Sequence, residues 1–590
     1  ICNINMGNFY TNERNVQIVL FLLKANGIKK VVASPGATNI TVVASMQNDS
    51  FFEMYSAADE RSAAYIACGL AAESGEPVVL SCTGATASRN YMPGLTEAFY
   101  RKLPLIAITS SKSSSMIAQL VAQVTDRTSP PSDVVKRSVL AGIVKDEDDE
   151  WDCMIKINQA LSTLKQNGGG PIHINLETTH SDDFSVEKLP KARIIKCITG
   201  YDKFPQIPSG RIGVFIGSHN RWTDEESELL DRFCASNNAV ALCDHTSNYK
   251  GKYRVLFSLP LSQDNYIPKL SQFDLLIHIG EVSGEYSGLN CLQVKEVWRV
   301  NEDGEIRDTF HQLTHVFDMS ESNFFEHYIK WDTPMSDSFL TSYKEEYRRI
   351  LNKMPEIPFS NIWVAKQLAP RLPESSVLHL GILNTLRSWN FFEIPDSVLS
   401  YSNVGGFGID GCLSTLIGAS LVHKDKLYFG LFGDLAFFYD MNVVSNRHVG
   451  ANLRILLINN GKGVEFRNYN HQAAQFEEAA DAFIAAAGHY GNQSPELIKH
   501  YAQDLGYEYL CASTKEEFEQ VVSRYLTPEI TDKPILFEVF TNTEEEKKAL
   551  KMVRSIESDS SMVIKKALKN AVKQTLGEKA IEQVRKTFKN

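Results

Sequence analysis

The sequence has few of the features that mark membrane, secreted or nucleic-acid-binding proteins. Its 590 residues contain no run of about 18 apolar residues, the length that a membrane-spanning helix needs. The N-terminus lacks a basic region followed by an apolar run, so no secretion signal is expected. The net charge of −11 argues against nucleic acid or an anionic membrane as the main partner.

Cysteine-based zinc and redox motifs and a dinucleotide-binding motif are missing as well. None of the ten cysteines belongs to a CxxC pair, which excludes the common zinc and redox motifs. Scattered, reduced cysteines favour a cytoplasmic location. The stretch 213–218 could suggest a dinucleotide site, but it has no GxGxxG pattern and no acidic residue at the required distance. A nicotinamide-dependent dehydrogenase therefore has little support.

Alternating strand and helix patterns fill most of the chain. This alternation predicts an α/β fold with parallel sheets, and the length predicts several domains. We expect three doubly wound domains over 1–185, 186–355 and 356–545, with a linker near 186–210. The predicted strands are, in the first domain, 31–34, 77–82, 103–109 and 171–176; in the second, 211–216, 239–243, 274–280 and 296–301; and in the third, 377–380, 428–432, 454–459 and 535–540.

The tail over 546–590 differs in composition from the rest of the chain. From Lys547 onward it has twelve Lys and Arg against four Asp and Glu. Apolar residues recur at helical spacing over 563–588, which predicts one or two amphipathic helices. These helices are expected to pack on the body or on a partner subunit, and a calmodulin-like or membrane target is the weaker alternative.

Two polar motifs follow neighbouring strands of the third domain. Asp434 ends the first strand within Gly433-Asp434-Leu435, and Asn460 ends the next within a segment that continues through Lys462 to Gly463 and Val464. The separation of 26 residues between Asp434 and Asn460 fits one helix and one strand, so both residues are expected at the carboxyl edge of the sheet. A carboxylate, an amide oxygen and a main-chain carbonyl are ligands that Mg²⁺ prefers. Either motif alone could be an ordinary turn.

On these residues the chain resembles the thiamine-diphosphate (ThDP) enzymes that include acetolactate synthase. That family carries Gly-Asp and, about 25–30 residues later, Asn-Asn as its metal–diphosphate motif. The resemblance implies that Asp434, Asn460 and the main-chain carbonyl of Lys462 hold Mg²⁺. Gly433, Leu435, Gly463 and Val464 are then expected around the diphosphate. The family often has a second glycine where this chain has Leu435.

The first domain contains a candidate for the acid that activates ThDP. Glu60 opens an Ala-rich helix, where an acid is also favoured simply by the helix dipole. The family order of Pro-Gly turn, Glu, Ala-rich helix, Gly-rich loop and Asn is matched at Pro35, Glu60, Thr86 and Asn90. The resemblance implies that Glu60 activates the aminopyrimidine ring, while Pro35, Thr86 and Asn90 line its pocket. It also implies inter-subunit sites in a homodimer or a dimer of dimers.

The segment 401–411 resembles one branch of this family most closely, the SEPHCHC synthases of the menaquinone pathway. Those enzymes decarboxylate 2-oxoglutarate and add the succinyl carbanion to isochorismate. The resemblance makes Ile409 the bulky residue that bends ThDP, with Gly408 and Asp410 beside the cofactor. A core isoleucine is the alternative for Ile409. In this family the middle domain binds FAD or stays empty, and FAD is not expected here.

The substrate positions match this branch only in part. The branch has arginines where this chain has Thr38 and Val404, so two bidentate carboxylate clamps are missing. Isochorismate is therefore not expected as the acceptor, and a less charged acceptor fits better. Arg387 matches a retained substrate arginine. Gln123 matches a glutamine facing the reacting carbons, and Glu465 matches an acid of some ThDP decarboxylases, although both could be ordinary surface residues.

These expectations combine into one leading function. The chain is predicted to be a Mg²⁺- and ThDP-dependent carboligase that decarboxylates a 2-oxo acid, such as 2-oxoglutarate or pyruvate, and transfers the carbanion to an acceptor. A simple 2-oxo acid decarboxylase that releases an aldehyde is the first alternative. A catalytically idle ThDP-fold scaffold is the second.

Overall fold

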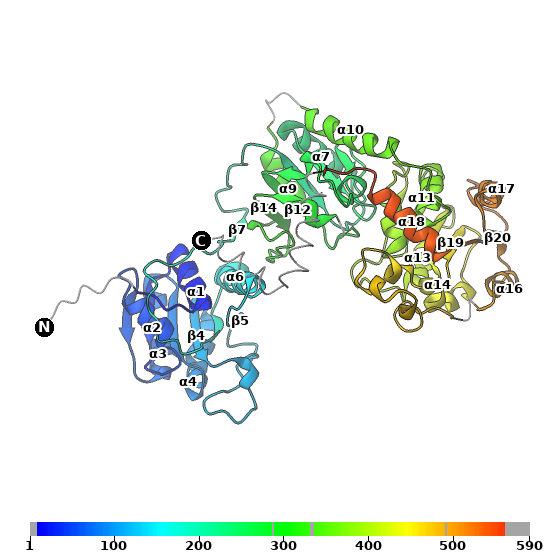
Figure 1. The fold of residues 1–590 in the computed structure, drawn as a ribbon. Coiled ribbons are helices and arrows are strands. Elements are labelled where there is room, and N and C mark those ends of the chain that lie inside the picture. Colours follow the sequence, from blue (N-terminus) through cyan, green and yellow to red (C-terminus); the bar gives the residue numbers. More distant parts are fainter. Residues whose placement is uncertain (1–8, 286–287, 331–335, 490–492, 561–590) are drawn as a thin grey trace. The chain divides into compact units, whose positions relative to one another are not determined.

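The computed structural model describes residues 9–285, 288–330, 336–489 and 493–560 (Figure 1). The chain divides into two compact units. The first takes in the chain up to Phe204 together with Asn301–Met319, and the second begins at Pro205 and holds the remaining residues. Parallel sheets flanked by helices build both units, so the α/β class predicted from the sequence is confirmed. The three domain boundaries stay a prediction.

A six-stranded parallel sheet forms the centre of the first unit, in the order β2-β1-β3-β4-β6-β5. Its strands are β1 (Lys30–Ala33), β2 (Glu53–Ser56), β3 (Val78–Thr83), β4 (Leu105–Ser111), β5 (Arg137–Ala141) and β6 (Ile172–Glu177). The helices around it are α1 (Arg14–Ala25), α2 (Ile40–Gln47), α3 (Glu60–Ser74), α4 (Thr86–Asn90), α5 (Met92–Arg101) and α6 (Glu147–Thr163).

Helices cover both faces of this sheet. Successive residues of a strand point to opposite faces, and in β1 Val31 packs in the core that contains α1 and α6, whereas Val32 packs in the core that contains α3 and α5. On the second face α3 and α5 approach closely, because a Cβ added to Gly94 would lie 2.4 Å from the Cβ of Ala64. The first unit is therefore doubly wound around two cores.

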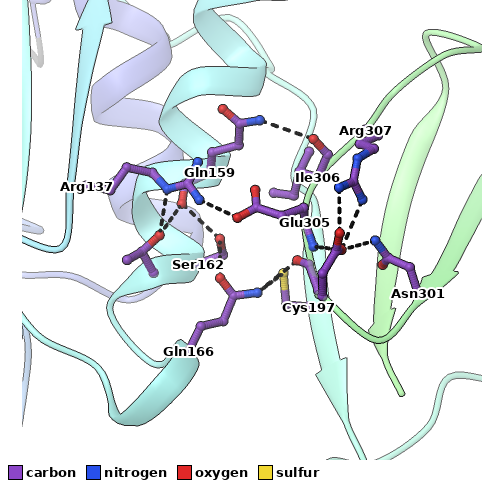
Figure 2. A network of polar contacts seen from close by, with 12 residues as sticks. Arg137, Gln159, Ser162, Gln166, Cys197, Asn301, Glu305, Ile306 and Arg307 are labelled. Carbon is purple, nitrogen blue, oxygen red and sulfur yellow. Dashed lines mark hydrogen bonds and ion pairs between the residues drawn. The ribbon is translucent and has the colours of Figure 1, made fainter. Parts of the chain in front are cut away.

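Residues 301–319 belong to the first unit through polar contacts with β5 and α6 (Figure 2). Arg137 forms an ion pair with Glu305 at 2.6 Å between NH2 and Oε1. Gln166, which follows α6, donates to the main-chain oxygen of Gly304 at 2.9 Å. These contacts join a stretch from the middle of the sequence to the N-terminal sheet.

A short strand pair completes this part of the first unit. Strand β7 (Lys196–Thr199) runs parallel to β15 (Leu313–Asp318). The segment near 186–210, predicted as a linker, therefore contains a short strand. Only Ile198 of β7 is fully buried, so the four residues give no apolar run that the sequence pattern could reveal.

The second unit contains a parallel arrangement in the order β10-β9-β8-β12-β14. Its strands are β8 (Ile212–Ile216), β9 (Val240–Cys243), β10 (Arg254–Leu256), β12 (Leu275–Ile279) and β14 (Val297–Asn301), with the small pair β11 (Gln272–Phe273) and β13 (Gln293–Val294) beside them in the sequence. Its helices are α7 (Asp224–Asn237), α8 (Ser258–Leu261), α9 (Glu321–Tyr328) and α10 (Ser338–Asn352). The four strands predicted in this region are confirmed within a few residues.

A further six-stranded parallel sheet of the second unit has the order β17-β16-β18-β19-β21-β20. Its strands are β16 (Val377–Leu380), β17 (Leu399–Tyr401), β18 (Tyr428–Gly433), β19 (Leu453–Asn459), β20 (Glu508–Ala512) and β21 (Ile535–Phe540). Its helices are α11 (Asn361–Leu368), α12 (Asn384–Trp389), α13 (Cys412–Ser420), α14 (Asp434–Asp440), α16 (Leu497–Asp504), α17 (Lys515–Tyr525) and α18 (Thr543–Arg554).

Helix α18 begins the basic tail and packs beside α11 (Figure 1). Its buried residues Ala549, Leu550 and Val553 join the same core as Val364 of α11. The first part of the tail is therefore helical and packs on the body. The helices predicted over 563–588 lie outside the described residues. Over the described part of the chain, no helix combines the length and apolar character needed to cross a bilayer.

Candidate cofactor and substrate site

In the first unit, Glu60 and Asn90 are brought together. Glu60 is the first residue of α3, and Asp59 before it caps the helix by accepting a hydrogen bond from the Arg61 amide. Asn90 ends α4 and donates from Nδ2 to Oε2 of Glu60 at 3.2 Å. The carboxyl group is half-buried. The sequence pattern, which placed both residues in one pocket, is thus consistent with the geometry.

Two further residues predicted for this pocket, Pro35 and Thr86, follow the ends of β1 and β3. Pro35 follows β1 and is exposed, and Thr86 is the exposed first residue of α4. A Cβ added to Gly36 would lie 2.0 Å from Cγ2 of Thr83, so only glycine allows this turn to pack on the end of β3. Gln123 is exposed, with a φ of 64°.

Arg127 supports the Gly-rich loop, a role that the sequence analysis missed. Its NH1 donates to the carbonyl of Gly84 at 3.1 Å, and its Nε donates to Oδ1 of Asn175 at 3.0 Å. A Cβ on Gly84 would lie 1.7 Å from NH1, so the glycine makes room for the guanidinium group. No short motif reveals this contact, because Arg127 reaches the loop from a segment more than forty residues later.

A small, partly open cavity lies close to this loop. Its volume is about 30 Å³, and Tyr91, Arg127 and His173 are among the residues that line it. Burial lowers the pKa of His173 to about 3, so its ring is neutral at physiological pH and bonds to Thr109 and Ser138. The volume suits a water molecule rather than a cofactor ring.

In the second unit, Asp434 faces the segment that contains Asn460. Strands β18 and β19 pair in parallel with Gly433 opposite Ile458, so both motifs leave the same edge of the sheet. Asp434 is only 2% exposed, and its Oδ2 accepts a hydrogen bond from the amide of Gly461 at 2.6 Å. The helix α14 begins at Asp434.

The amide oxygen of Asn460 is the strongest sign of a ligand at this edge. Oδ1 of Asn460 is buried and has no hydrogen-bond partner among the described residues. A buried, unpaired acceptor is costly, and a metal ion would satisfy it. A Cβ added to Gly433 meets no atom within 4 Å, which leaves space beside Asp434. The residues present therefore fit a hard cation with a diphosphate.

This donor set contains only one carboxylate. Over the described ranges no group of three or more His, Cys, Asp and Glu side chains could hold a metal. The ligand set predicted here combines the Asp434 carboxylate with the Asn460 amide oxygen and the Lys462 main-chain carbonyl. Because two of these three ligands are not His, Cys, Asp or Glu side chains, the set does not form a group of that kind. It is typical of a cation that also binds phosphate oxygens.

The loop after Asn460 is fixed by contacts that the sequence did not reveal. The Lys462 ammonium group contacts Asp481 at 2.6 Å between Nζ and Oδ2. The amide of Gly463 donates to the carbonyl of Ala485 at 2.6 Å, and Val464 is buried. The loop and the segment 480–489 therefore support one another.

His489 was also missed by the sequence analysis. Its Nε2 lies 3.5 Å from Oδ2 of Asp434, and its ring packs against Phe438 with centroids 4.8 Å apart. A lone histidine 55 residues after Asp434 carries no pattern, so only the fold could bring the two together.

The glycines in the segment before α13 differ in how much free space surrounds them. Cβ atoms added to Gly405 and Gly406 meet nothing within 4 Å, whereas Gly408 is crowded by Oδ1 of Asp410 at 2.4 Å. Ile409 is partly buried against the core beneath α13. Its position fits either of the two interpretations of this residue, a cofactor contact or a core side chain.

Arg387 and Glu465, the two candidate substrate residues, contact one another. NH2 of Arg387 lies 2.7 Å from Oε1 of Glu465, with side chains 7% and 14% exposed. Arg387 belongs to α12, which follows β16, and Glu465 follows β19. Strands β16 and β19 lie on either side of β18, the strand that precedes Asp434. The Arg387–Glu465 pair therefore lies at the same edge of the sheet as Asp434 and Asn460.

The two positions where arginines of the related branch are expected to be missing, Thr38 and Val404, are buried. Thr38 donates to the carbonyl of Ser110 at 2.5 Å, and it is 5% exposed. Val404 is 4% exposed and belongs to the core. Neither position supplies a cation.

Two buried acids, Glu538 and Glu546, lie close enough to Asp434 to interact with it electrostatically. Burial raises the pKa of Glu546 to about 7, although hydrogen bonds from Thr541 and from the amide of Asn361 act in the opposite direction. Burial also raises the pKa of Glu538, which accepts a hydrogen bond from Asn459 at 2.7 Å. Both acids contact segments adjoining the candidate site rather than the site itself.

Comparison with known proteins gives a consistent result. Residues 14–129 match the thiamine pyrophosphate enzyme, N-terminal TPP binding domain. A 2-succinyl-5-enolpyruvyl-6-hydroxy-3-cyclohexene-1-carboxylate synthase of Phocaeicola vulgatus is 32% identical over 562 residues, covering 91% of this chain and 97% of the relative. The enzyme of the same name from Bacteroides fragilis is 30% identical over 568 residues, covering 92% and 98%. The chain therefore belongs to the thiamine-diphosphate-dependent enzymes, in the family of these synthases.

Proposed function

We propose that this enzyme uses ThDP and Mg²⁺ to decarboxylate a 2-oxo acid and to transfer the resulting acyl carbanion to an acceptor. The observation that carries the proposal is the unsatisfied Oδ1 of Asn460 beside the buried carboxylate of Asp434. The relatives are named as synthases of a succinyl-bearing product, which supports carbon–carbon bond formation here.

The metal site is assigned to three oxygen ligands. Asp434 supplies a carboxylate oxygen, Asn460 its amide oxygen and Lys462 its main-chain carbonyl. The amide of Gly461 orients the Asp434 carboxylate through the hydrogen bond to Oδ2. Around the diphosphate we place the backbone at Gly433, Leu435, Gly463 and Val464.

The residues assigned to the cofactor's rings come from different subunits. When bound, ThDP supplies a nucleophilic carbon and a ring that accepts the electron pair left when CO₂ departs. Glu60 holds a proton against the aminopyrimidine, and the hydrogen bond from Asn90 fixes the position of its carboxyl group. Pro35 and Thr86 line the same pocket. Ile409 would contact the cofactor, with Gly408 and Asp410 beside it.

The substrate side of the site is assigned to fewer residues. Gln123 is placed toward the reacting carbons, and Arg387 and Glu465 toward the donor. Because Thr38 and Val404 supply no cation, we place a less charged acceptor than isochorismate in the site.

The proposal is tested by product analysis. The full chain is incubated with ThDP, Mg²⁺ and a panel of 2-oxo acids, with and without acceptor aldehydes, and CO₂ and products are measured. A ligated product with loss of CO₂ is expected. Free aldehyde as the sole product in every reaction would replace the carboligase by a simple decarboxylase, and absence of both CO₂ release and ThDP binding would favour an idle scaffold.

The active form is proposed to be a homodimer or a dimer of dimers, with Glu60 from one subunit and Asp434 from another at each site. Mixing inactive Glu60→Gln and Asp434→Ala chains under subunit exchange then restores activity, because one of the two mixed sites is intact. Mixtures that stay as inactive as their parents, although mass spectrometry shows mixed oligomers, would contradict shared sites.

A further inference from the structure

A groove on the last sheet of the second unit lies apart from the candidate cofactor site, and we call it the edge groove because β17 is the edge strand of that sheet. Its volume is about 300 Å³, which is at the lower end of the range for small-molecule sites. The strand register pairs its floor residues across three neighbouring strands, so they share one face of the sheet. These residues are Val377, His379, Leu399, Tyr401 and Tyr428. Three of them open their strands, whereas Asp434 follows the carboxyl end of β18, so the groove lies toward the edge opposite the candidate metal site.

The groove exists because helix α13 covers only part of this face. Residues of α13 pack with Tyr428 in one core, but the helix ends at Ser420. Val422, in the turn that follows, lines the groove and is 71% exposed. Leu399 and Tyr401 of the edge strand are therefore only half-buried. An apolar and aromatic floor that stays open to solvent favours a ligand with a planar ring.

His379 adds to this floor a polar atom that no described residue satisfies. Its side chain is 5% exposed, and its Nε2 has no hydrogen-bond partner among the described residues. Burial lowers the pKa of His379 to about 4, so the ring is neutral at physiological pH. It lies beside the ring of Tyr401, with centroids 5.5 Å apart. Because an unpaired buried polar atom is costly, a polar ligand group that reaches this ring would offset the cost.

Basic side chains from two parts of the unit line the groove. His423 and Lys426 belong to the turn after α13, and Arg221 belongs to the loop after β8. Neither Arg221 nor Lys426 forms an ion pair with any residue that the structure describes. The described lining contains no acid. Asp425, on the same turn, is exposed and acts electrostatically on Tyr428, so the groove itself keeps a positive charge.

Contacts within the unit hold Arg221 beside the floor. The next residue, Trp222, donates from Nε1 to the main-chain oxygen of Ser247 at 2.9 Å. The side chain that follows Ser247 accepts a hydrogen bond from the amide of Ser400 in β17 at 3.0 Å. The loop of Arg221 and the edge strand are therefore tied to the same segment. Arg221 is close enough to Tyr401 to oppose the rise that burial causes in the pKa of that tyrosine.

We propose that the edge groove is a binding site for a small molecule that combines a planar aromatic ring with an anionic group. The ring packs on the aromatic floor at Tyr401, and the anionic group contacts Arg221 and Lys426. An aliphatic anion would lack the ring contacts, and a neutral aromatic molecule would leave both cations without a partner. Either a phosphate or a carboxylate can supply the negative charge. This site is separate from the proposed cofactor site and does not depend on it.

Calorimetric titration of the full-length enzyme tests both sources of negative charge. The enzyme is loaded with ThDP and Mg²⁺ so that the cofactor site is filled, and the probes are adenosine monophosphate and indole-3-carboxylate. We expect saturable binding of at least one probe, with a dissociation constant below about 1 mM. The tighter of the two identifies the anionic group. Asp434→Ala should bind the same probe equally well, because the groove lies apart from the metal site.

Two variants remove the cations that the proposal uses. Arg221→Gln and Lys426→Gln should each weaken probe binding by on the order of tenfold, because each loses a charge-assisted hydrogen bond. Lys424→Gln is the matched control, because Lys424 is exposed on the same turn and does not line the groove. It removes the same charge and should leave the dissociation constant unchanged. The bound probe should also slow hydrogen exchange of the amides over 419–428.

Several results would overturn the inference. One is that neither probe binds saturably. Others are unchanged affinity in both groove variants, equal weakening in Lys424→Gln, or binding that disappears in Asp434→Ala and so belongs to the cofactor site. If Arg221→Gln does not fold, Lys426→Gln and the exchange measurement still decide. Failure of the proposed function has a different signature, since it abolishes CO₂ release but leaves probe binding at the groove intact.

Discussion

Glu546 offers a stability prediction whose size follows from its surroundings. Its carboxyl group is buried in the first turn of α18, and burial raises its pKa from 4.5 to about 7. Because the folded state holds the proton more tightly than the unfolded state, this group's contribution is most favourable below pH 4.5 and is lost as the pH rises through about 7. A shift of this size corresponds to about 3 kcal/mol.

The variant Glu546→Gln should remove the free-energy cost of ionising this buried carboxyl group. Glutamine keeps an oxygen that can accept the hydrogen bonds from the amide of Asn361 and the hydroxyl of Thr541, but it carries no charge at any pH. At pH 8 the variant should be more stable than the wild type by about 3 kcal/mol, and at pH 4.5 the difference should be close to zero.

Hydrogen exchange of the α18 amides, corrected for the intrinsic rate at each pH, measures this difference as a local free energy of opening. Glu544→Gln is the control, because Glu544 lies in the same helix turn and is exposed. A variant that is no better protected than the wild type at pH 8, or that gains equally at both pH values, would refute the reasoning.

Two further predictions concern the first unit. Glu60→Gln should retain ThDP binding by calorimetry but lose turnover by on the order of 100-fold or more, and near-normal turnover would remove Glu60 from its assigned role. Gly94→Ala should lower the urea midpoint of unfolding, because the added Cβ would lie 2.4 Å from that of Ala64, an overpacking that typically costs about 1–3 kcal/mol. Gly69→Ala in the same helix as Ala64 meets nothing within 4 Å and should not lower the midpoint; equal effects of the two substitutions would contradict the packing argument.

The sequence predicted the interior of the sheets well and their edges poorly. Strands such as β3 and β19 are buried on both faces, so they form continuous apolar runs that the pattern identifies. The strands that were missed include β2 and β5 at the edges of the first sheet and β17 and β20 at the edges of the last. These strands are partly exposed, and their residues therefore alternate or vary in polarity.

In the candidate site, some residues could be predicted from the local sequence pattern, whereas others are brought together only by the fold. Asp434 and Asn460 could be predicted because each follows an apolar strand, and parallel strands bring their carboxyl ends together. The contacts of Arg387 with Glu465, and of His489 with Asp434, join residues 78 and 55 positions apart. No repeat or spacing rule links such residues, so these contacts became visible only in the fold.

The most direct test of the central claim is a calorimetric titration of ThDP into the full-length wild-type enzyme, with Mg²⁺ and then with a chelator. The account predicts saturable binding that requires the metal, and loss of that binding in Asp434→Ala and in Asn460→Ala although both variants remain folded by circular dichroism. Binding that is equally tight without a divalent cation, or unchanged in both variants, would contradict a metal–diphosphate site at Asp434 and Asn460.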